Sequence, residues 1–266
     1  MMKEETRIFP PVIAEKTAGK VYHTDGVGRS DSEVLLFDDM VLKIEKTSEL
    51  ADNEEKMMLW LHGKLPVPRV LGFAREDGKN YLLTERLRGY MAFDAALSDK
   101  KAVARILAEG ILAFWAVDAA DCPVKYTLEE KLTAAKARME SGELTHLPDG
   151  SASCLGFSTL EELYAYLNEN RPAEDLVLSH GDYCLPNVLI AEDALCGFLD
   201  LGRAGVSDRW SDIADCLWSM HYNFCELGGM SEETFEECKV AFFSTLGVEK
   251  DEQRIKYHDL LSEFFA

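Results

Sequence analysis

The sequence predicts an α+β protein with a small, strand-rich N-terminal lobe and a larger, mainly helical C-terminal lobe. Short runs that alternate apolar and polar residues dominate up to about residue 86. Helical apolar periodicity follows from about residue 101, interrupted by two short apolar runs at 188–190 and 194–199 that indicate a strand hairpin. We therefore expect a border near residue 86, with residues 1–86 in one lobe and residues 87–266 in the other.

Residues 41–45 alternate apolar and charged side chains, which predicts a strand from which Lys43 projects. Thr47 or Ser48 can cap a following helix that runs roughly to residue 62. Glu54 falls on the apolar stripe of that helix, with Leu50, Met57, Met58 and Leu61. A carboxylate is costly to bury unless a cation meets it, so Lys43 is its expected partner. The alternative is that both side chains are simply solvated.

Residues 25–32 precede an apolar run and predict a tight turn between two strands. Gly26 and Gly28, with Ser30 beside them, would let the backbone approach an anion closely, although an ordinary hairpin turn would have the same composition. Residues 81–84 read as a further strand, which leads at residues 85–89 into the expected hinge between the lobes.

Three oxygen-bearing side chains are the main candidates for chemistry. Asp182 follows His180-Gly181, Asn187 comes five positions later, and Asp200 ends the second run of the predicted hairpin. Antiparallel pairing would bring Asn187 opposite residues 198–200, and such hard oxygen ligands suit Mg²⁺ better than zinc or copper. Taken alone, His-Gly-Asp would be no more than a turn with a capping aspartate.

Six helices are predicted in the C-terminal part from apolar periodicity. They cover residues 101–117, 128–139, 159–167, 210–224, 231–243 and 251–264.

The formal net charge of −20 disfavours binding to nucleic acid or to anionic membranes and favours a cationic small molecule. The first residues lack the apolar core of a secretory signal, and no run is long enough to span a bilayer. Seven cysteines without a Cys-x-x-Cys pair indicate reduced thiols. We expect a cytoplasmic protein, either a monomer or a weak homodimer.

The segment from Ser179 to Arg203 resembles the catalytic core of the aminoglycoside phosphotransferases, above all the aminoglycoside 3'-phosphotransferases. Their pattern reads His-Gly-Asp, four variable residues, Asn, and later Gly-Phe-Ile-Asp-x-Gly-Arg. Residues 57–68, 208–214 and 260–265 are also similar, so the likeness covers nearly the whole chain. The resemblance implies a protein-kinase-like two-lobed fold, ATP or GTP as phosphate donor, Mg²⁺, and an aminoglycoside hydroxyl, the 3'-hydroxyl first, as acceptor.

The resemblance also implies a role for each candidate. Asp182 would be the base or orienting group, Asn187 and Asp200 would hold Mg²⁺, and Asp212 would support the catalytic loop. The residues implied at the nucleotide are Lys43, Glu54, Gly26, Gly28, Ser30, Thr84, Glu85 and Leu87. The residues implied around the acceptor are Asp149, Arg203, Glu226, Glu263 and the terminal carboxylate of Ala266, although Arg203 could instead reach a phosphate or the loop support.

One departure from the family pattern bears on the acceptor. Residues 219–224 carry no acid where relatives carry them, although Glu226 follows soon after. A related kinase acting on another amino-sugar, a choline-like compound or a hydroxylated metabolite is therefore the alternative. A pseudokinase that senses nucleotide is a third reading, and the full set of Lys43, Glu54, Asp182, Asn187 and Asp200 argues against it.

Overall fold

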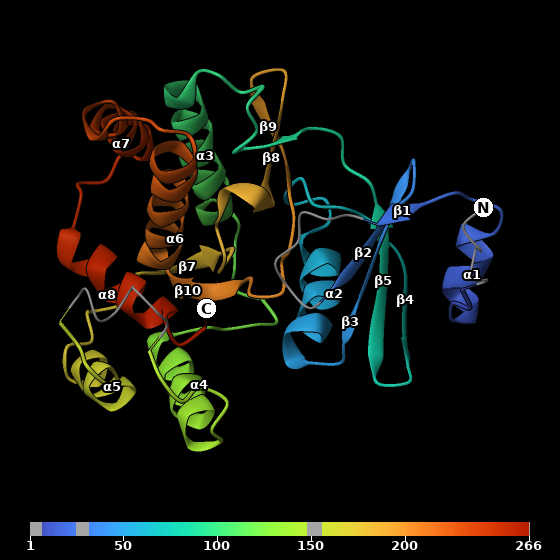
Figure 1. The fold of residues 1–266 in the computed structure, drawn as a ribbon, viewed down its shortest axis with the longest axis horizontal. Helices are drawn as coiled ribbons and strands as arrows, with labels where there is room; N and C mark the ends of the chain where they lie inside the picture. The colour runs from blue at the N-terminus through green and yellow to red at the C-terminus, as the bar shows by residue number, and fades with distance from the viewer. Residues whose placement is uncertain (1–6, 25–31, 148–155, 266) are drawn as a thin grey trace.

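The computed structural model describes residues 7–24, 32–147 and 156–265, and it has the predicted α+β architecture (Figure 1). Five antiparallel strands form the N-terminal sheet in the order β1-β2-β3-β5-β4. They are β1 (His23–Thr24), β2 (Glu33–Leu36), β3 (Met40–Lys46), β4 (Val70–Glu76) and β5 (Lys79–Glu85). The strands predicted at 41–45 and 81–84 are confirmed as β3 and β5.

Helix α2 (Glu49–Leu61) lies beside this sheet, on the side that faces the helical part of the molecule (Figure 1). Of the two proposed caps Ser48 is the one used, because its Oγ accepts a hydrogen bond from the Ala51 amide at 3.1 Å. The expected stripe is buried from Glu54 onward, but Leu50 is 41% exposed and does not belong to it.

Helix α1 (Pro11–Thr17) was not predicted from the sequence. It starts with proline at its first position, which suits a helix start, but seven residues give too little periodicity to reveal a helix. The helix packs against β4 at the far edge of the sheet (Figure 1).

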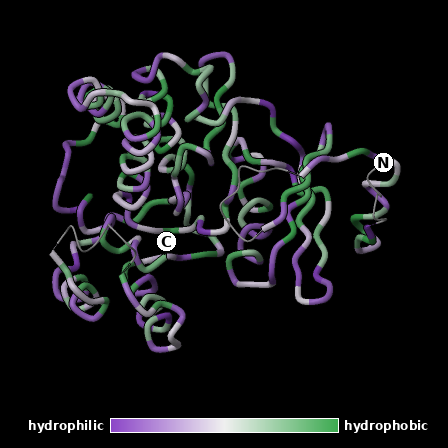
Figure 2. The backbone as a smooth tube through the Cα atoms, in the orientation of Figure 1, coloured by the Kyte–Doolittle hydropathy of each residue, from purple (hydrophilic) through white to green (hydrophobic). Residues whose placement is uncertain are grey.

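All six predicted helices are present in the C-terminal part. They are α3 (Lys100–Trp115), α4 (Leu128–Glu140), α5 (Leu160–Glu169), α6 (Arg209–His221), α7 (Glu232–Leu246) and α8 (Glu252–Ser262). The prediction for α6 was wrong at its end, because the α-helix changes to a π-helix over Tyr222–Leu227. Figure 2 shows hydrophobic and hydrophilic segments side by side on α4 and α5, as expected for helices with one face in a core and one in solvent.

Two small sheets carry the loops of the site. β7 (Leu176–Ser179) pairs with β10 (Gly205–Asp208), and β6 (Tyr90–Met91) pairs with β8. The predicted hairpin is confirmed as β8 (Val188–Ala191) and β9 (Ala194–Phe198), with Val188 opposite Phe198.

A cluster of aromatic side chains packs the β8–β9 hairpin against α3. Phe114 of α3 lies edge-on to Phe198, with ring centroids 4.8 Å apart, and both are buried. Tyr183 is also buried and donates its hydroxyl to the Leu107 carbonyl at 2.9 Å. Gly110 leaves the necessary room, because a Cβ there would lie 2.0 Å from the Tyr183 hydroxyl. The loop from 180 to 187 is thus held from within the core.

Asn53 connects α2 to the C-terminal part. Its side chain is buried and donates Nδ2 to the Gly202 carbonyl at 2.7 Å and to the Ala204 carbonyl at 3.3 Å. These carbonyls follow directly after Asp200, so this side chain fixes the distance between α2 and the end of the hairpin.

None of the helices within the described ranges combines the length and the apolar character needed to cross a lipid bilayer.

We predict that Asn53→Ala lowers the free energy of unfolding by about 1–3 kcal/mol, because two carbonyls lose a buried donor. Urea denaturation followed by circular dichroism measures this change. Lys56→Ala, at an exposed position on the same helix, is the control and should change stability by less than about 0.5 kcal/mol. Equal stability of the Asn53 variant and the control would contradict the assigned link.

Candidate active site

The loop that carries Asp182 is held from below by Asp212 on α6. The buried Asp212 carboxylate accepts hydrogen bonds from Ser179 Oγ at 2.8 Å, from the His180 amide at 2.8 Å and from the Gly181 amide at 2.9 Å. Such charge-assisted bonds are stronger than neutral ones. Asp212 therefore has the contacts expected of a loop support.

Gly181 is required by geometry. Its φ is +79°, and a Cβ at this position would lie 2.0 Å from the Arg203 carbonyl oxygen. Any side chain would both strain the backbone and push the segment after Asp200 away. The glycine of the His-Gly-Asp motif thus permits a close approach of the loop to the residues that follow the hairpin.

Asp182 and Asn187 are in direct contact. Asn187 Nδ2 donates to the Asp182 backbone carbonyl at 2.9 Å and to its Oδ2 at 3.1 Å. Because the amide nitrogen points at Asp182, the amide oxygen is the atom left to face a cation. The five-residue spacing has therefore brought the two side chains together.

The hairpin brings Asn187 close to Asp200. The Leu199 amide donates to the Asn187 carbonyl at 2.9 Å, as antiparallel pairing predicted, and His180 Nε2 lies 2.9 Å from the Leu199 carbonyl. Asp200 itself has a φ of +55°, a left-handed conformation that aspartate adopts more readily than most residues. Asp200 lies two residues beyond the end of β9, and its side chain is 49% exposed.

Lys43 connects the two lobes. Its Nζ lies 2.7 Å from Glu54 Oε2 and 3.2 Å from Asp200 Oδ1. The predicted pairing of Lys43 with Glu54 is confirmed. Glu45, two residues along β3 on the same face, adds a third carboxylate at 3.6 Å.

The charge state of this cluster follows from its burial and its spacing. Burial opposes the charge on Lys43, but the carboxylates around it, led by Glu54, outweigh burial and raise the pKa of Lys43. Burial also raises the pKa of Glu54, whereas Lys43 lowers it. Because the two groups are 2.7 Å apart, each favours the charged form of the other.

The donor set fits Mg²⁺. Asp200 offers a half-exposed carboxylate and Asn187 an amide oxygen, both hard ligands of the kind that bind Mg²⁺ beside substrate phosphates. Asp200 Oδ1 contacts Lys43, which leaves Oδ2 for a metal.

The segment that was predicted to bind the nucleobase follows β5. Thr84 is buried at the end of the strand, and Glu85 is exposed with a loose ion pair to Arg69 at 3.8 Å. The Glu85 and Arg86 amides already donate to the carbonyls of Arg69 and Asp39, at 2.9 and 3.1 Å. Leu87 packs over β9, where a Cβ on Gly197 would lie 2.5 Å from Leu87 Cδ1. Gly26, Gly28 and Ser30 lie outside the described residues.

Among the described residues, the three that were expected at the acceptor form no hydrogen bond or ion pair with one another. Arg203 donates to the Phe265 carbonyl at 2.7 Å and so holds the end of the chain. Glu226 lies in the π-helix, 3.5 Å from His221 Nδ1, and its side chain is mostly exposed. Glu263 is half-buried at the end of α8. Asp149 and Ala266 lie outside the described residues.

Two acids near the site were missed from the sequence. Asp215 is half-buried on α6, and burial, together with the nearby Asp182 and Asp212, raises its pKa well above the ordinary range. Glu45 adjoins Lys43, and burial raises its pKa. Helical spacing from Asp212 and strand spacing from Lys43 were the signals that could have identified them.

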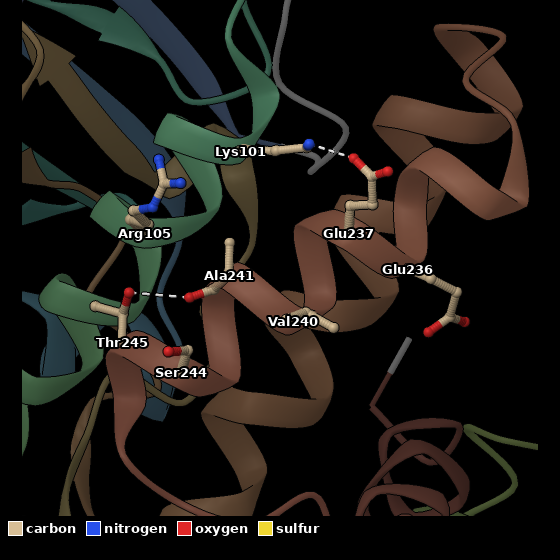
Figure 3. Close-up of a pocket in the computed structure, with 8 residues that line it drawn as sticks. All are labelled: Lys101, Arg105, Glu236, Glu237, Val240, Ala241, Ser244 and Thr245. Carbon is tan, nitrogen blue, oxygen red and sulfur yellow. Dashed lines mark hydrogen bonds and ion pairs between the residues drawn. The ribbon is translucent and has the colours of Figure 1, made fainter.

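A hollow between α3 and α7 lies away from this cluster (Figure 3). It is lined by residues such as Lys101, Glu237 and Val240, with Lys101 and Glu237 forming an ion pair across it. None of the predicted site residues lines it.

We predict that Asp212→Asn lowers kcat by about 10²-fold while the protein stays folded, because one amide cannot accept from three donors and the loop shifts. The KM for nucleotide should change little, since Lys43 and Asp200 keep their contacts. Steady-state kinetics and thermal unfolding, with Asp118→Asn as an exposed control, measure both effects. A variant with wild-type kcat would contradict the support role.

Comparison with known proteins places the chain in a family. A family model described as the phosphotransferase enzyme family matches residues 22–232. An aminoglycoside 3'-phosphotransferase of Enterococcus faecalis is 34% identical over 249 residues, 92% of this chain and 89% of that protein. One of Niallia circulans is 37% identical over 217 residues, 80% of this chain and 78% of that protein.

Solved structures of aminoglycoside phosphotransferases also resemble this chain. An aminoglycoside 3'-phosphotransferase of type VIII has a TM-score of 0.78 at 26% identity, over 96% of this chain and 97% of that one. An aminoglycoside phosphotransferase of Streptomyces rimosus has a TM-score of 0.80 at 22% identity, over 95% and 96%, and so shares the fold. The predicted protein-kinase-like fold is confirmed, and the chain belongs to the aminoglycoside 3'-phosphotransferase family.

Proposed function

We propose that this protein transfers the γ-phosphate of ATP, or of GTP, to a hydroxyl of an aminoglycoside, most simply the 3'-hydroxyl, and so protects a cell against the antibiotic. The observation that carries the proposal is the contact of Asp182 with Asn187 and of Lys43 with Glu54 and Asp200. Relatives that carry the 3'-phosphotransferase name are 34% and 37% identical to this chain. The proposal places a cationic amino-sugar at the Asp182 side of this cluster.

In the proposed reaction the hydroxyl oxygen of the acceptor forms a bond to the γ-phosphorus. The bond from that phosphorus to the β–γ bridging oxygen breaks, and the nucleoside diphosphate leaves with the electron pair. Asp182 orients the hydroxyl and accepts its proton. Lys43, held by Glu54, neutralises phosphate oxygens, and the catalytic effect is mainly one of positioning and charge.

Asn187 and Asp200 would hold Mg²⁺, which when bound neutralises charge on the phosphate oxygens. Lys43 must then exchange part of its contact with Asp200 for a phosphate. The nucleobase of the nucleotide would lie between the two lobes, which we place on either side of residue 86. Its hydrogen-bond donor would be the Leu87 amide, because the Glu85 and Arg86 amides are already used. Thr84 and Glu85 would border the base.

The net charge supports a cationic substrate, and the free thiols support a reducing compartment. A net charge of −20 favours capture of a polycation and disfavours nucleic acid. The six described cysteines are free thiols, in keeping with a reducing cytoplasm. We propose a cytoplasmic monomer or weak homodimer.

A direct test compares wild type with Asp182→Ala on kanamycin and on a 3'-deoxy aminoglycoside, with ATP and with GTP. Wild type should phosphorylate the first acceptor and not the second, and the variant should lose about 10²- to 10⁴-fold in kcat. Nucleotide binding, measured by calorimetry, should survive in the variant. Undiminished turnover by Asp182→Ala would remove the assigned role, and activity only on an unrelated alcohol would favour another small-molecule kinase.

A pH dependence follows from Asp259 on α8. Burial, with Glu263 nearby, raises the pKa of Asp259 to about 7. The folded protein therefore holds this proton more tightly than the unfolded chain, so this group's contribution to stability falls as pH rises from about 4 to about 7. A cationic acceptor favours the ionised form, so its affinity should rise from pH 6 to pH 8 with release of a proton.

Calorimetry in buffers of different ionisation enthalpy measures the number of protons released when the acceptor binds. Asp259→Asn is the test variant. Because the amines of the acceptor titrate in the same range, the variant should keep their contribution, release fewer protons on binding than wild type, and gain stability near pH 8. Glu109→Gln, at an exposed position on α3, should behave like wild type. Identical pH profiles for wild type and Asp259→Asn would show that this acid does not face the acceptor.

A further inference from the structure

A pair of stacked aromatic rings lies at the C-terminal end of α6, where the α-helix gives way to the π-helix. Trp218 and Tyr222, one helical turn apart, have ring centroids 5.5 Å apart and ring planes at 2°. Trp218 is 56% exposed, which is unusual for an indole. Because Tyr222 covers one face of the indole, much of the exposed area belongs to its other face and its edge.

The position of the pair relative to the catalytic loop follows from contacts of α6. Asp212 binds the amides of His180 and Gly181, and two turns later Ser219 Oγ accepts from the Leu185 amide at 3.0 Å. The loop therefore runs along α6 over these two turns, about 10 Å of helix axis. Trp218 lies at the height of Leu185 along the helix axis and about 100° around the helix from Ser219.

The face that carries the pair also carries an acid of the site. At 100° per residue, Asp215, Trp218 and Tyr222 lie within about 60° of one another around the helix. Asp215 is close enough to Asp182 for the two charges to interact. Trp218 is about 4.5 Å and Tyr222 about 10.5 Å from Asp215 along the axis.

This segment of α6 is held rigidly. Ser219 is buried, and Asn223 donates Nδ2 to the Ser219 carbonyl at 2.8 Å where the α-helix becomes a π-helix. Such π-helical turns are rare and often occur at functional sites. The rings are therefore presented in one arrangement, which lowers the entropy cost of binding.

We propose that Trp218 and Tyr222 form a platform on which an amino-sugar ring of the acceptor stacks while Asp215 meets one of its ammonium groups. This inference rests on the proposed function and names residues that determine its acceptor specificity. An indole face attracts both the apolar face of a sugar ring and a cation. The platform would serve in place of the acids that residues 219–224 lack.

The parallel stack favours a sugar ring that carries ammonium groups over a compact quaternary ammonium group. A compact trimethylammonium group is bound best by several aromatic faces that converge on it, whereas rings at 2° to each other face the same way. An ammonium group bound beside Asp215 would favour the ionised form of its carboxylate and so gain charge complementarity.

The test measures acceptor KM, ATP KM and kcat with kanamycin for Trp218→Ala, Tyr222→Ala and Trp218→Phe. Trp218→Ala should raise the acceptor KM by about 5- to 30-fold and leave the ATP KM within about twofold, and Trp218→Phe should restore most of the affinity. Val240→Ala, an exposed apolar position in the hollow of Figure 3, is the matched control and should leave all three constants unchanged. Thermal unfolding verifies that each variant is folded.

The outcomes separate this inference from the proposed function. If wild type phosphorylates kanamycin and both alanine variants keep the wild-type acceptor KM, the platform is refuted and the function stands. If wild type phosphorylates no aminoglycoside, calorimetric titration with kanamycin decides: weaker binding to Trp218→Ala supports the platform, and equal or absent binding refutes it. Turnover of choline that depends on Trp218, with kanamycin inert, would overturn the assignment to an amino-sugar.

Discussion

The Lys43 ammonium group is the interaction on which the site depends, because it joins Glu54 of the N-terminal lobe to Asp200 of the C-terminal lobe. Glu54 is 3% exposed, and a carboxylate in that position is tolerable only with a cation beside it. The same cation restrains Asp200, whose left-handed backbone would otherwise be free to relax. Buried Asn53 supports this arrangement by fixing α2 against the backbone that follows Asp200.

Helix α6 has the corresponding role in the C-terminal part of the site. It binds the loop amides through Asp212 and the Leu185 amide through Ser219, and it carries Asp215 and the ring pair on an adjacent face. One rigid helix therefore positions both the reacting carboxylate and the surface where we place the acceptor. One face of the helix holds the catalytic loop, and an adjacent face carries the residues where we place the acceptor. Substitutions on the second face can therefore change the acceptor without disturbing the phosphate-transfer residues.

Much of the fold, and the main charge pair of the site, could be predicted from the sequence. Strand alternation identified β3 and β5, helical periodicity identified the six C-terminal helices, and the hairpin between Asn187 and Asp200 followed from two apolar runs. The pairing of Lys43 with Glu54 was predictable because a carboxylate on an apolar stripe needs a partner. Family resemblance, more than physics, suggested the role of each residue.

Other features depend on tertiary contacts that leave little trace in the sequence. The short helix α1 and the π-helix after His221 have no distinct periodicity. Arg203 was expected near phosphate, loop or acceptor, and its bond to the Phe265 carbonyl depends on where the chain end docks. Helical spacing from Asp212 marked Asp215 as a neighbour of the loop support, but its proximity to Asp182 on another element is visible only in the structure.

The most direct measurement of the central claim is a crystal structure with a non-hydrolysable ATP analogue and Mn²⁺, located by its anomalous signal. The account predicts a manganese peak between the Asn187 amide oxygen and the Asp200 carboxylate, with Lys43 Nζ on a phosphate oxygen and still in contact with Glu54. A nucleotide whose metal lies away from both side chains, or whose phosphates do not reach Lys43, would contradict it.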